Sequence, residues 1–417
     1  MPEPSPNPQP KSGSWLNPRR VRAHALVLML MMWTVFAWDY SITGVRDRAG
    51  QIKGADFLHF YTIGLLAREH RGGDLYNMAA QAATAQAHIP EAAGVRYLPL
   101  YPPQVSLLFA PLASFEYGPA LFLWSLASLA IYGLGCAAIL RTCPALRKDI
   151  LSVVICVAAY PAFWHLIAWG QTPALALGCF TMAYFALRKH QRFLAGLALG
   201  CLIYKPQLGL ASALVCAASG EWEMIAGGAL SAFAQLGVVW IYYGTDPLLD
   251  WWNAMIHVRN QMTLLEPKLY QTHSLRTFWT MLLPWPRWAG AAYGISAALV
   301  VAITVKTWRS KAVIEMRFCS LLLATVLISP HLTVYDLVIL APALLLLAER
   351  AATSAGDRCL PWLIYFTYAL PLLGPLTRWT HVQLSVAAMA ALLAWCGAGK
   401  SAREIASVGQ PTAAVAT

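Results

Sequence analysis

Charged side chains are scarce in this sequence, and Asp56 is one of the few whose position is suited to catalysis. It follows a polar stretch and begins an apolar, helix-like segment. An aspartate at this point often caps the helix, because its side chain accepts hydrogen bonds from the free N–H groups of the first turn. A carboxylate at the edge of an apolar region is also suited to take the proton of a substrate hydroxyl as a general base. The two roles are compatible.

Lys205 lies within a long apolar stretch and is followed by Pro206 and Gln207. An uncompensated ammonium group in a membrane costs at least about 2.5–3.5 kcal/mol on insertion scales, and a long side chain lowers this cost by extending to the interface. Proline removes a helix hydrogen bond and predicts a break beside the lysine. A cation fixed at such a break can hold a lipid phosphate. We favour this role for Lys205 and assign Gln207 to the same site.

His331 ends a Ser-Pro-His motif between two apolar segments. A single histidine at a helix end is more often a capping or interfacial residue than a catalytic one. Tyr335 and Asp336 follow inside the next apolar segment, however, and ionisable groups within a membrane span are functional candidates by default. We therefore predict that His331 stabilises a leaving phosphate or acts as an acid–base partner.

Other polar residues predict the walls of a substrate pocket. Arg276 lies in a loop rich in Trp and Tyr, where it is the charged residue best placed to face a phosphate. Most of the aromatic residues in this loop are expected to form an interfacial belt, and a minority could stack on a sugar. The other pocket predictions lie in short polar motifs: His59, Tyr101, Gln104, Gln171 and His273.

The composition indicates which elements position these residues. Of 417 residues, 58% are hydrophobic and 12% are charged, whereas a soluble domain carries about 25% charged residues. The mean hydropathy is +0.53, and apolar segments of about 20 residues, long enough to cross a bilayer, recur along the chain. We therefore predict an all-α, polytopic integral membrane protein with about 12 transmembrane helices. Juxtamembrane helices are expected in its first outer loop.

Several function classes are excluded or disfavoured. The net charge of +11 comes from short basic clusters between apolar segments, where such clusters orient helices, so nucleic acid is not an expected partner. The nine cysteines show no metal-ligand spacing and fall mostly in apolar segments as small buried residues. Motifs of ATPases, zinc proteases and serine hydrolases are missing from the sequence. No cofactor or metal is expected.

The chain is expected to form one membrane domain over residues 19–399. Residues 1–18 are rich in proline and predict a disordered cytoplasmic tail, and residues 400–417 predict a second cytoplasmic tail. The basic clusters place loops 44–101 and 244–286 on the outer side under the positive-inside rule. This topology requires that segment 103–115 does not span and that 192–219 is a pair bent back at Lys205-Pro206. The polar motifs then converge on the outer face.

The order of these motifs resembles glycosyltransferase family 87, over about residues 21–397. The resemblance implies a GT-C fold and the inverting transfer of a hexose, mannose in the best-known members, from a polyprenyl-phosphate donor to a lipid-linked or other acceptor. The motifs that carry the resemblance are Asp56, Tyr101-Pro102-Pro103, Gly170-Gln171, Lys205-Pro206-Gln207, His273-Ser274-Leu275, and Ser329-Pro330-His331 with Tyr335-Asp336.

The residues and the resemblance together predict a metal-independent hexosyltransferase of the bacterial plasma membrane, with its active site on the extracytoplasmic face. Asp56 is the expected base, and Lys205 and His331 are expected to stabilise the leaving phosphate. The expected partners are the lipid donor, a lipid-linked or glycan acceptor and membrane lipids. A transporter or lipid flippase is the alternative, although such folds usually show inverted repeats and none is evident. A non-catalytic scaffold would leave Asp56, Lys205 and His331 unrelated.

Overall fold

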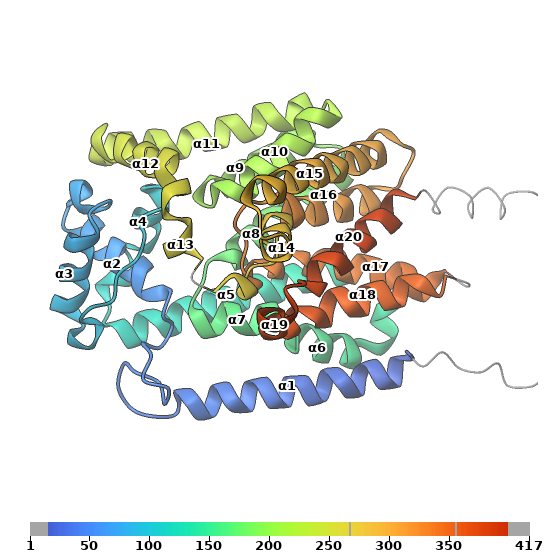
Figure 1. The fold of residues 1–417 in the computed structure, drawn as a ribbon, viewed down its shortest axis with the longest axis horizontal. Coiled ribbons are helices and arrows are strands. Elements are labelled where there is room, and N and C mark those ends of the chain that lie inside the picture. Colours follow the sequence, from blue (N-terminus) through green and yellow to red (C-terminus); the bar gives the residue numbers. More distant parts are fainter. Residues whose placement is uncertain (1–15, 267, 355–356, 399–417) are drawn as a thin grey trace, which may run out of the picture.

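The computed structural model describes residues 16–266, 268–354 and 357–398, and the described residues form helices and connecting loops without any strand (Figure 1). The two backbone bridges, Arg46 with Ile52 and Thr272 with Thr333, are isolated. The prediction of an all-α membrane protein is confirmed. The C-terminal tail predicted for 400–417, and all but the last three residues of the tail predicted for 1–18, lie outside the described residues.

Among the described residues, five helices, or six if a bent pair counts as one span, are long and apolar enough to cross a membrane. The bent pair turns by 47° at Ala159-Tyr160. The prediction of about 12 spans would also require the shorter apolar helices to cross. The long elements are α1 (Pro18–Tyr40), α5 (Tyr117–Leu140), α11 (Trp222–Tyr243), α15 (Pro286–Arg309), the stretch α18 (Cys359–Ala369), η9 (Leu370–Leu376) and α19 (Thr377–Thr380), and the bent pair η4 (Leu146–Asp149) with α6 (Ile150–Ala158) and α7 (Pro161–Trp169).

The shorter helices form the core. Nearly every residue of α16 is buried, as expected for a helix that is apolar on all sides and surrounded by others. The predicted break at Lys205 is present, because η5 ends at Tyr204 and α10 begins at Pro206. The shorter helices of the core are α8 (Pro173–Arg188), α9 (Arg192–Gly200), η5 (Cys201–Tyr204), α10 (Pro206–Ser219), α16 (Ile314–Ile328), η8 (Val334–Leu340), α17 (Ala341–Thr353) and α20 (Leu384–Gly397).

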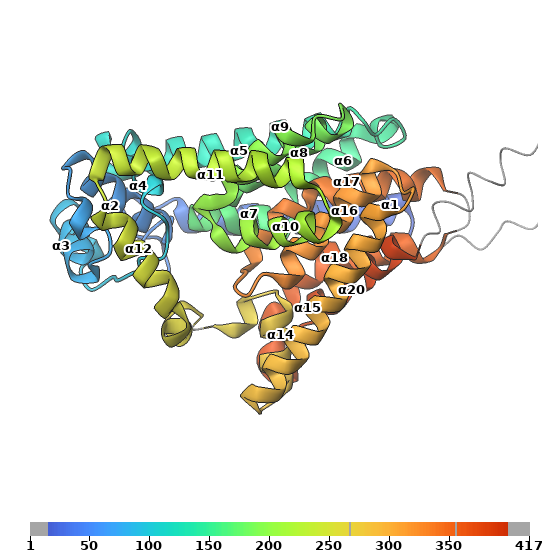
Figure 2. The ribbon, with the colours of Figure 1, turned by 90° about the horizontal axis from the view of Figure 1, so that it is seen from above.

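The helices of the 44–101 loop lie at the end of the molecule opposite to the start of α1 and the end of α20 (Figures 1 and 2). They are α2 (Phe57–Arg68), η1 (Gly72–Asp74), α3 (Met78–His88) and η2 (Pro90–Ala92), followed by α4 (Gln104–Phe109) and η3 (Leu112–Ser114). The second long loop contains α12 (Asp246–His257), η6 (Val258–Gln261), α13 (Met262–Leu265), η7 (Leu269–Gln271) and α14 (Leu275–Leu282). Segment 103–115 therefore holds only short helices.

Helices α9 and α11 pack so closely that only glycine fits between them. A Cβ atom on Gly227 would lie 2.2 Å from the carbonyl oxygen of Phe193, whereas one on Gly237 would meet no atom within 4 Å. Close approach through glycine is a common way for membrane helices to associate.

Gly227→Ala is therefore expected to lower the thermal unfolding temperature of the detergent-solubilised protein. Relief of the clash requires α9 and α11 to separate, and such overpacking costs about 1–3 kcal/mol. Gly237→Ala, in the same helix, is the matched control and should leave stability equal or slightly higher. Equal unfolding temperatures for the two variants would show that this packing is unimportant.

Candidate functional site

Asp56 precedes α2, but its side chain makes no capping hydrogen bond to that helix. One carboxylate oxygen, Oδ2, instead accepts a hydrogen bond of 2.8 Å from Nε2 of Gln171. The Asp56 backbone N–H donates to the Trp169 carbonyl at 3.1 Å, which fixes the start of α2 against the end of α7. The capping role considered from the sequence is therefore not the one that Asp56 fills.

The Gly-Gln motif after α7 makes this contact possible. Gly170 has a left-handed φ of +64°, and a Cβ atom there would lie 2.6 Å from Cβ of Phe57. The turn and the close approach both require glycine. Oε1 of Gln171 accepts from the Tyr101 hydroxyl at 3.4 Å and from the Thr172 N–H at 3.3 Å. The amide is thus oriented with its NH₂ group toward Asp56.

Burial raises the pKa of the Asp56 carboxyl above its ordinary value, and the hydrogen bond from Gln171 and the charge of Lys205 oppose the rise. The charge of Asp336 acts in the same direction as burial. A raised pKa makes a carboxylate a stronger base at neutral pH.

Lys205 is buried and forms an ion pair with Oδ1 of Asp336, the side chains of the two residues being 4% and 1% exposed. The other oxygen of Asp336 accepts from the Thr333 backbone N–H at 3.0 Å and from the Thr333 hydroxyl at 3.1 Å. The ammonium nitrogen also lies 5.0 Å from the centre of the Tyr335 ring. Lys205 therefore does not extend to the surface; Asp336 holds it inside.

The pair Asp56 and Gln171 and the pair Lys205 and Asp336 form one site. The charges of Lys205 and Asp336 both act on Asp56, and the charges of both carboxylates act with burial to raise the pKa of Tyr101. The Tyr204 hydroxyl donates to the Thr172 carbonyl at 3.1 Å, which joins the break before Lys205 to the Gly-Gln turn. The structure thus brings together Asp56, Tyr101, Gln171, Lys205, Tyr335 and Asp336, all named from the sequence.

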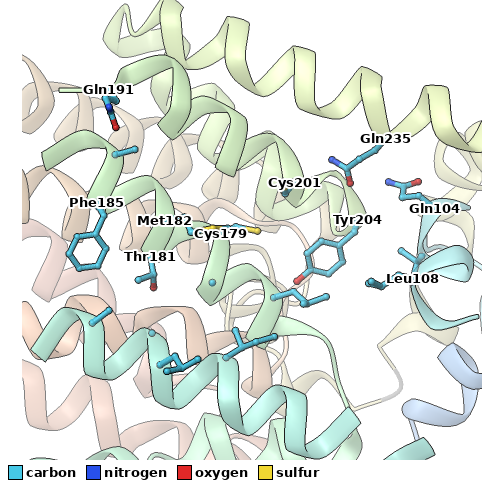
Figure 3. Close-up of a pocket in the computed structure, with 18 of the residues that line it drawn as sticks. Gln104, Leu108, Cys179, Thr181, Met182, Phe185, Gln191, Cys201, Tyr204 and Gln235 are labelled. Atoms are coloured by element: carbon cyan, nitrogen blue, oxygen red, sulfur yellow. The ribbon is translucent and has the colours of Figure 1, made fainter. Parts of the chain in front are cut away.

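A cavity of about 990 Å³ is lined by Tyr204, whose hydroxyl contacts Thr172 of the site (Figure 3). It follows α8 from Leu175 to Lys189, a rise of about 21 Å, between α5 on one side and α4, η5 and α11 on the other. At one end Tyr204 precedes Lys205 directly in the chain. The lining is predominantly apolar and includes Leu108, Ile131, Leu134, Ala138, Leu175, Met182, Phe185, Ala186 and Val238.

Metal ligands are not grouped in the described part of the chain: no three His, Cys, Asp or Glu side chains there are placed to hold a metal ion. Among the curated proteins and the solved structures, no match to the chain is found. A family model, described as glycosyltransferase family 87, matches residues 100–330, which is more than half of the chain.

The chain belongs to glycosyltransferase family 87. This membership favours an enzyme over the transporter and scaffold alternatives. The matched segment of this glycosyltransferase contains Tyr101, Gln171 and Lys205, while Asp56 and Asp336 lie outside it. The structure joins both carboxylates to the matched segment through the contacts with Gln171 and Lys205.

Two residues predicted for this site belong to a separate cluster in the glycosyltransferase. His331 Nδ1 lies 2.8 Å from Glu266 Oε1, and Arg276 binds the other oxygen of Glu266. Burial disfavours the charged form of Glu266, but the hydrogen bonds from His331 and Arg276 outweigh this effect and lower its pKa. Among the described residues, no hydrogen bond or ion pair joins this cluster directly to Asp56 or Lys205. Sequence reasoning missed Glu266; its only signal was an acidic residue in an otherwise apolar Leu-Leu-Glu segment.

The other predicted pocket residues of the glycosyltransferase take different positions. His273 is buried, with Nδ1 2.7 Å from the Ser385 hydroxyl, and burial lowers its pKa to about 3. His59 faces the Tyr97 and Tyr101 rings, and burial lowers its pKa to about 4. The backbone oxygen of Gln207 accepts from Ser329 at 3.3 Å. Gln104 lines the end of the cavity.

Proposed function

We propose that this glycosyltransferase moves a hexose, namely mannose, from a polyprenyl-phosphate donor to a lipid-linked or other acceptor. The transfer would invert the anomeric carbon and need no metal ion. It would take place on the extracytoplasmic face of a bacterial plasma membrane. The observation that carries the proposal is a long apolar cavity lined at one end by Tyr204, the residue directly before the buried cation Lys205.

Asp56 is the base in this scheme. An acceptor hydroxyl attacks the anomeric carbon of the donor, and its proton passes to the Asp56 carboxylate. The bond between the anomeric carbon and the phosphate oxygen breaks, and the electron pair remains on the phosphate. Gln171 holds the carboxylate through a hydrogen bond of 2.8 Å and thereby fixes the direction from which the acceptor is deprotonated.

Lys205 stabilises the charge that develops on the leaving phosphate. In the structure its ammonium group is paired with Asp336, whose second oxygen is engaged by Thr333. The pair holds the ammonium in a fixed position in a low-dielectric region, where a preorganised cation acts strongly on developing charge. A lysine in this place supplies the positive charge that a divalent metal supplies in other phosphate-releasing enzymes.

The cavity suits the prenyl chain of the donor. It is bounded by apolar side chains along α8, and its size falls within the range of small-molecule sites in proteins. A chain lying in it would present its phosphate beside Tyr204 and therefore next to Lys205. The sugar would then lie between the cation and Asp56.

The proposal is tested with the purified full-length protein in lipid vesicles that contain radiolabelled heptaprenyl-phosphate mannose and total membrane lipid. We expect labelled glycolipid of inverted anomeric configuration, formed equally well with and without EDTA. Transfer from a nucleotide sugar but not from the prenyl donor would contradict the proposal. Retention of configuration would contradict the role given to Asp56.

Filling the cavity is expected to weaken donor binding. Ala138 lines the cavity, whereas its neighbour Ala137 on α5 is exposed and is not among the lining residues. Ala138→Phe should raise the donor KM about tenfold, the effect of excluding roughly two methylene groups from apolar contact. Ala137→Phe is the matched control. Equal donor KM values for the two variants would show that the lipid lies elsewhere.

A further inference from the structure

One polar side chain at the end of the cavity has no partner. The amide of Gln104 points toward the cavity from the first residue of α4 (Figure 3). Both its Nε2 and its Oε1 are buried, and neither has a hydrogen-bond partner in the described part of the chain. A buried donor and acceptor left unpaired cost free energy, and such groups in a native structure call for an explanation.

The polar groups around Gln104 are already engaged. Ser106, on the same helix, bonds to the Tyr243 hydroxyl at 2.7 Å. Gln235 uses its Nε2 to donate to the carbonyls of Ser231 and Gly200, at 3.1 and 3.3 Å. The Tyr204 hydroxyl donates to Thr172. These three neighbours are satisfied by the protein itself, so their hydrogen bonds do not pair the Gln104 amide.

The chemistry of the amide limits what can satisfy it. A carboxamide offers donors and an acceptor side by side. The ionised phosphate of a prenyl donor only accepts hydrogen bonds, so it would leave Oε1 unpaired. A hydroxyl group both donates and accepts. A partner that satisfies both atoms must therefore both donate and accept hydrogen bonds, as a sugar hydroxyl does.

We propose that Gln104 binds a hydroxyl of the sugar substrate at the outer end of the cavity and so contributes to sugar specificity. This inference rests on the proposed function. Tyr101, which contacts Gln171, lies three residues before Gln104. Tyr204, which lines the same cavity as Gln104, directly precedes Lys205. The hydroxyl can belong to the transferred hexose or to the acceptor, and the experiment separates these two sources.

The test measures binding of two lipids to the full-length protein: heptaprenyl phosphate and heptaprenyl-phosphate mannose. Gln104→Leu should weaken binding of the mannose-bearing lipid about three- to tenfold, the usual worth of a neutral hydrogen bond. Binding of the bare phosphate lipid should not change. The unfolding temperature of unliganded Gln104→Leu should equal or exceed that of the wild type, because the substitution removes an unpaired buried amide. Gln86→Leu, on the exposed face of α3, is the control.

If the hydroxyl belongs to the acceptor, Gln104→Leu should instead raise the acceptor KM by the same factor and leave both lipid affinities unchanged. The inference is overturned if neither the mannose-dependent affinity nor the acceptor KM changes. It is also overturned if the variant loses affinity for both lipids equally and unfolds at a lower temperature, since that result marks a structural residue. A wild-type protein that binds neither lipid would overturn the proposed function as well, so the two failures are distinguishable.

Discussion

Asp56→Asn is expected to lower the rate of sugar transfer at saturating donor by about 10²–10⁴-fold, the usual contribution of a positioned general base. The amide keeps the size of the side chain and can still bond to Gln171, but it cannot take the proton of the acceptor hydroxyl. Because Asp56 makes no capping bond to α2, the unfolding temperature should stay close to that of the wild type. Initial rates in the vesicle assay and thermal unfolding of the same preparation measure both effects.

The control for this variant is Asp74→Asn, because Asp74 lies in the same loop and forms only an exposed ion pair with Arg71. Its transfer rate should remain near that of the wild type. A full rate in Asp56→Asn would show that another group accepts the proton.

The pH dependence of wild-type transfer has a definite sign. The base must be ionised to act, so the rate should fall as the pH is lowered through the pKa of Asp56. Burial raises this pKa, so the fall should begin at a higher pH than for an ordinary aspartate. If the rate stays unchanged until the pH reaches the ordinary range of an aspartate pKa, the assignment of Asp56 as the base is contradicted.

The second large effect is expected at the buried ion pair. Lys205→Met should reduce transfer by about 10²–10³-fold, the cost of losing one preorganised group at a developing negative charge. The same change leaves Asp336 buried without its partner, which destabilises a protein by about 3–5 kcal/mol. A loss of activity in this variant alone could therefore be a loss of folding.

The double variant Lys205→Met/Asp336→Asn separates the two explanations. It removes both charges while the asparagine oxygen can still accept from Thr333, so stability should return toward the wild-type value. Transfer should stay as low as in Lys205→Met. Recovery of transfer together with stability would show that Lys205 has only a structural role. The unfolding temperature and the single-turnover rate measure the two properties independently.

Local signals in the sequence account for much of the fold. Proline after Lys205 predicts the break, and η5 and α10 meet there. The apolar segments predict helices, and their all-α arrangement is confirmed. The number of spans stays a prediction, because α8, α9 with η5, α10 and α20 are apolar but short. Length alone does not decide whether such a helix crosses a membrane.

The pairing of side chains could not be predicted in the same way. Asp336 and His331 are five residues apart and were expected to lie in one site, but Asp336 bonds to Lys205 and His331 to Glu266. The chain between them is extended at Thr333, with φ −100° and ψ 171°, and successive side chains of extended backbone point in opposite directions. The partners lie 131 and 65 residues away in sequence, and only the tertiary fold brings them close.

The two hydrogen bonds from Thr333 to Asp336 determine which position of the ion pair carries the negative charge. The Thr333 N–H donates to the Asp336 side chain and the Asp336 N–H donates to the Thr333 side chain, which makes a capping box at the start of η8. The residue at position 336 must therefore accept hydrogen bonds as well as carry charge. Lysine has donors only. Exchanging the two residues would keep the net charge and the attraction but would leave the Thr333 N–H without an acceptor. The cation of this site can therefore reside at position 205 and not at 336, and a relative with the pair reversed would need a different beginning for this helix.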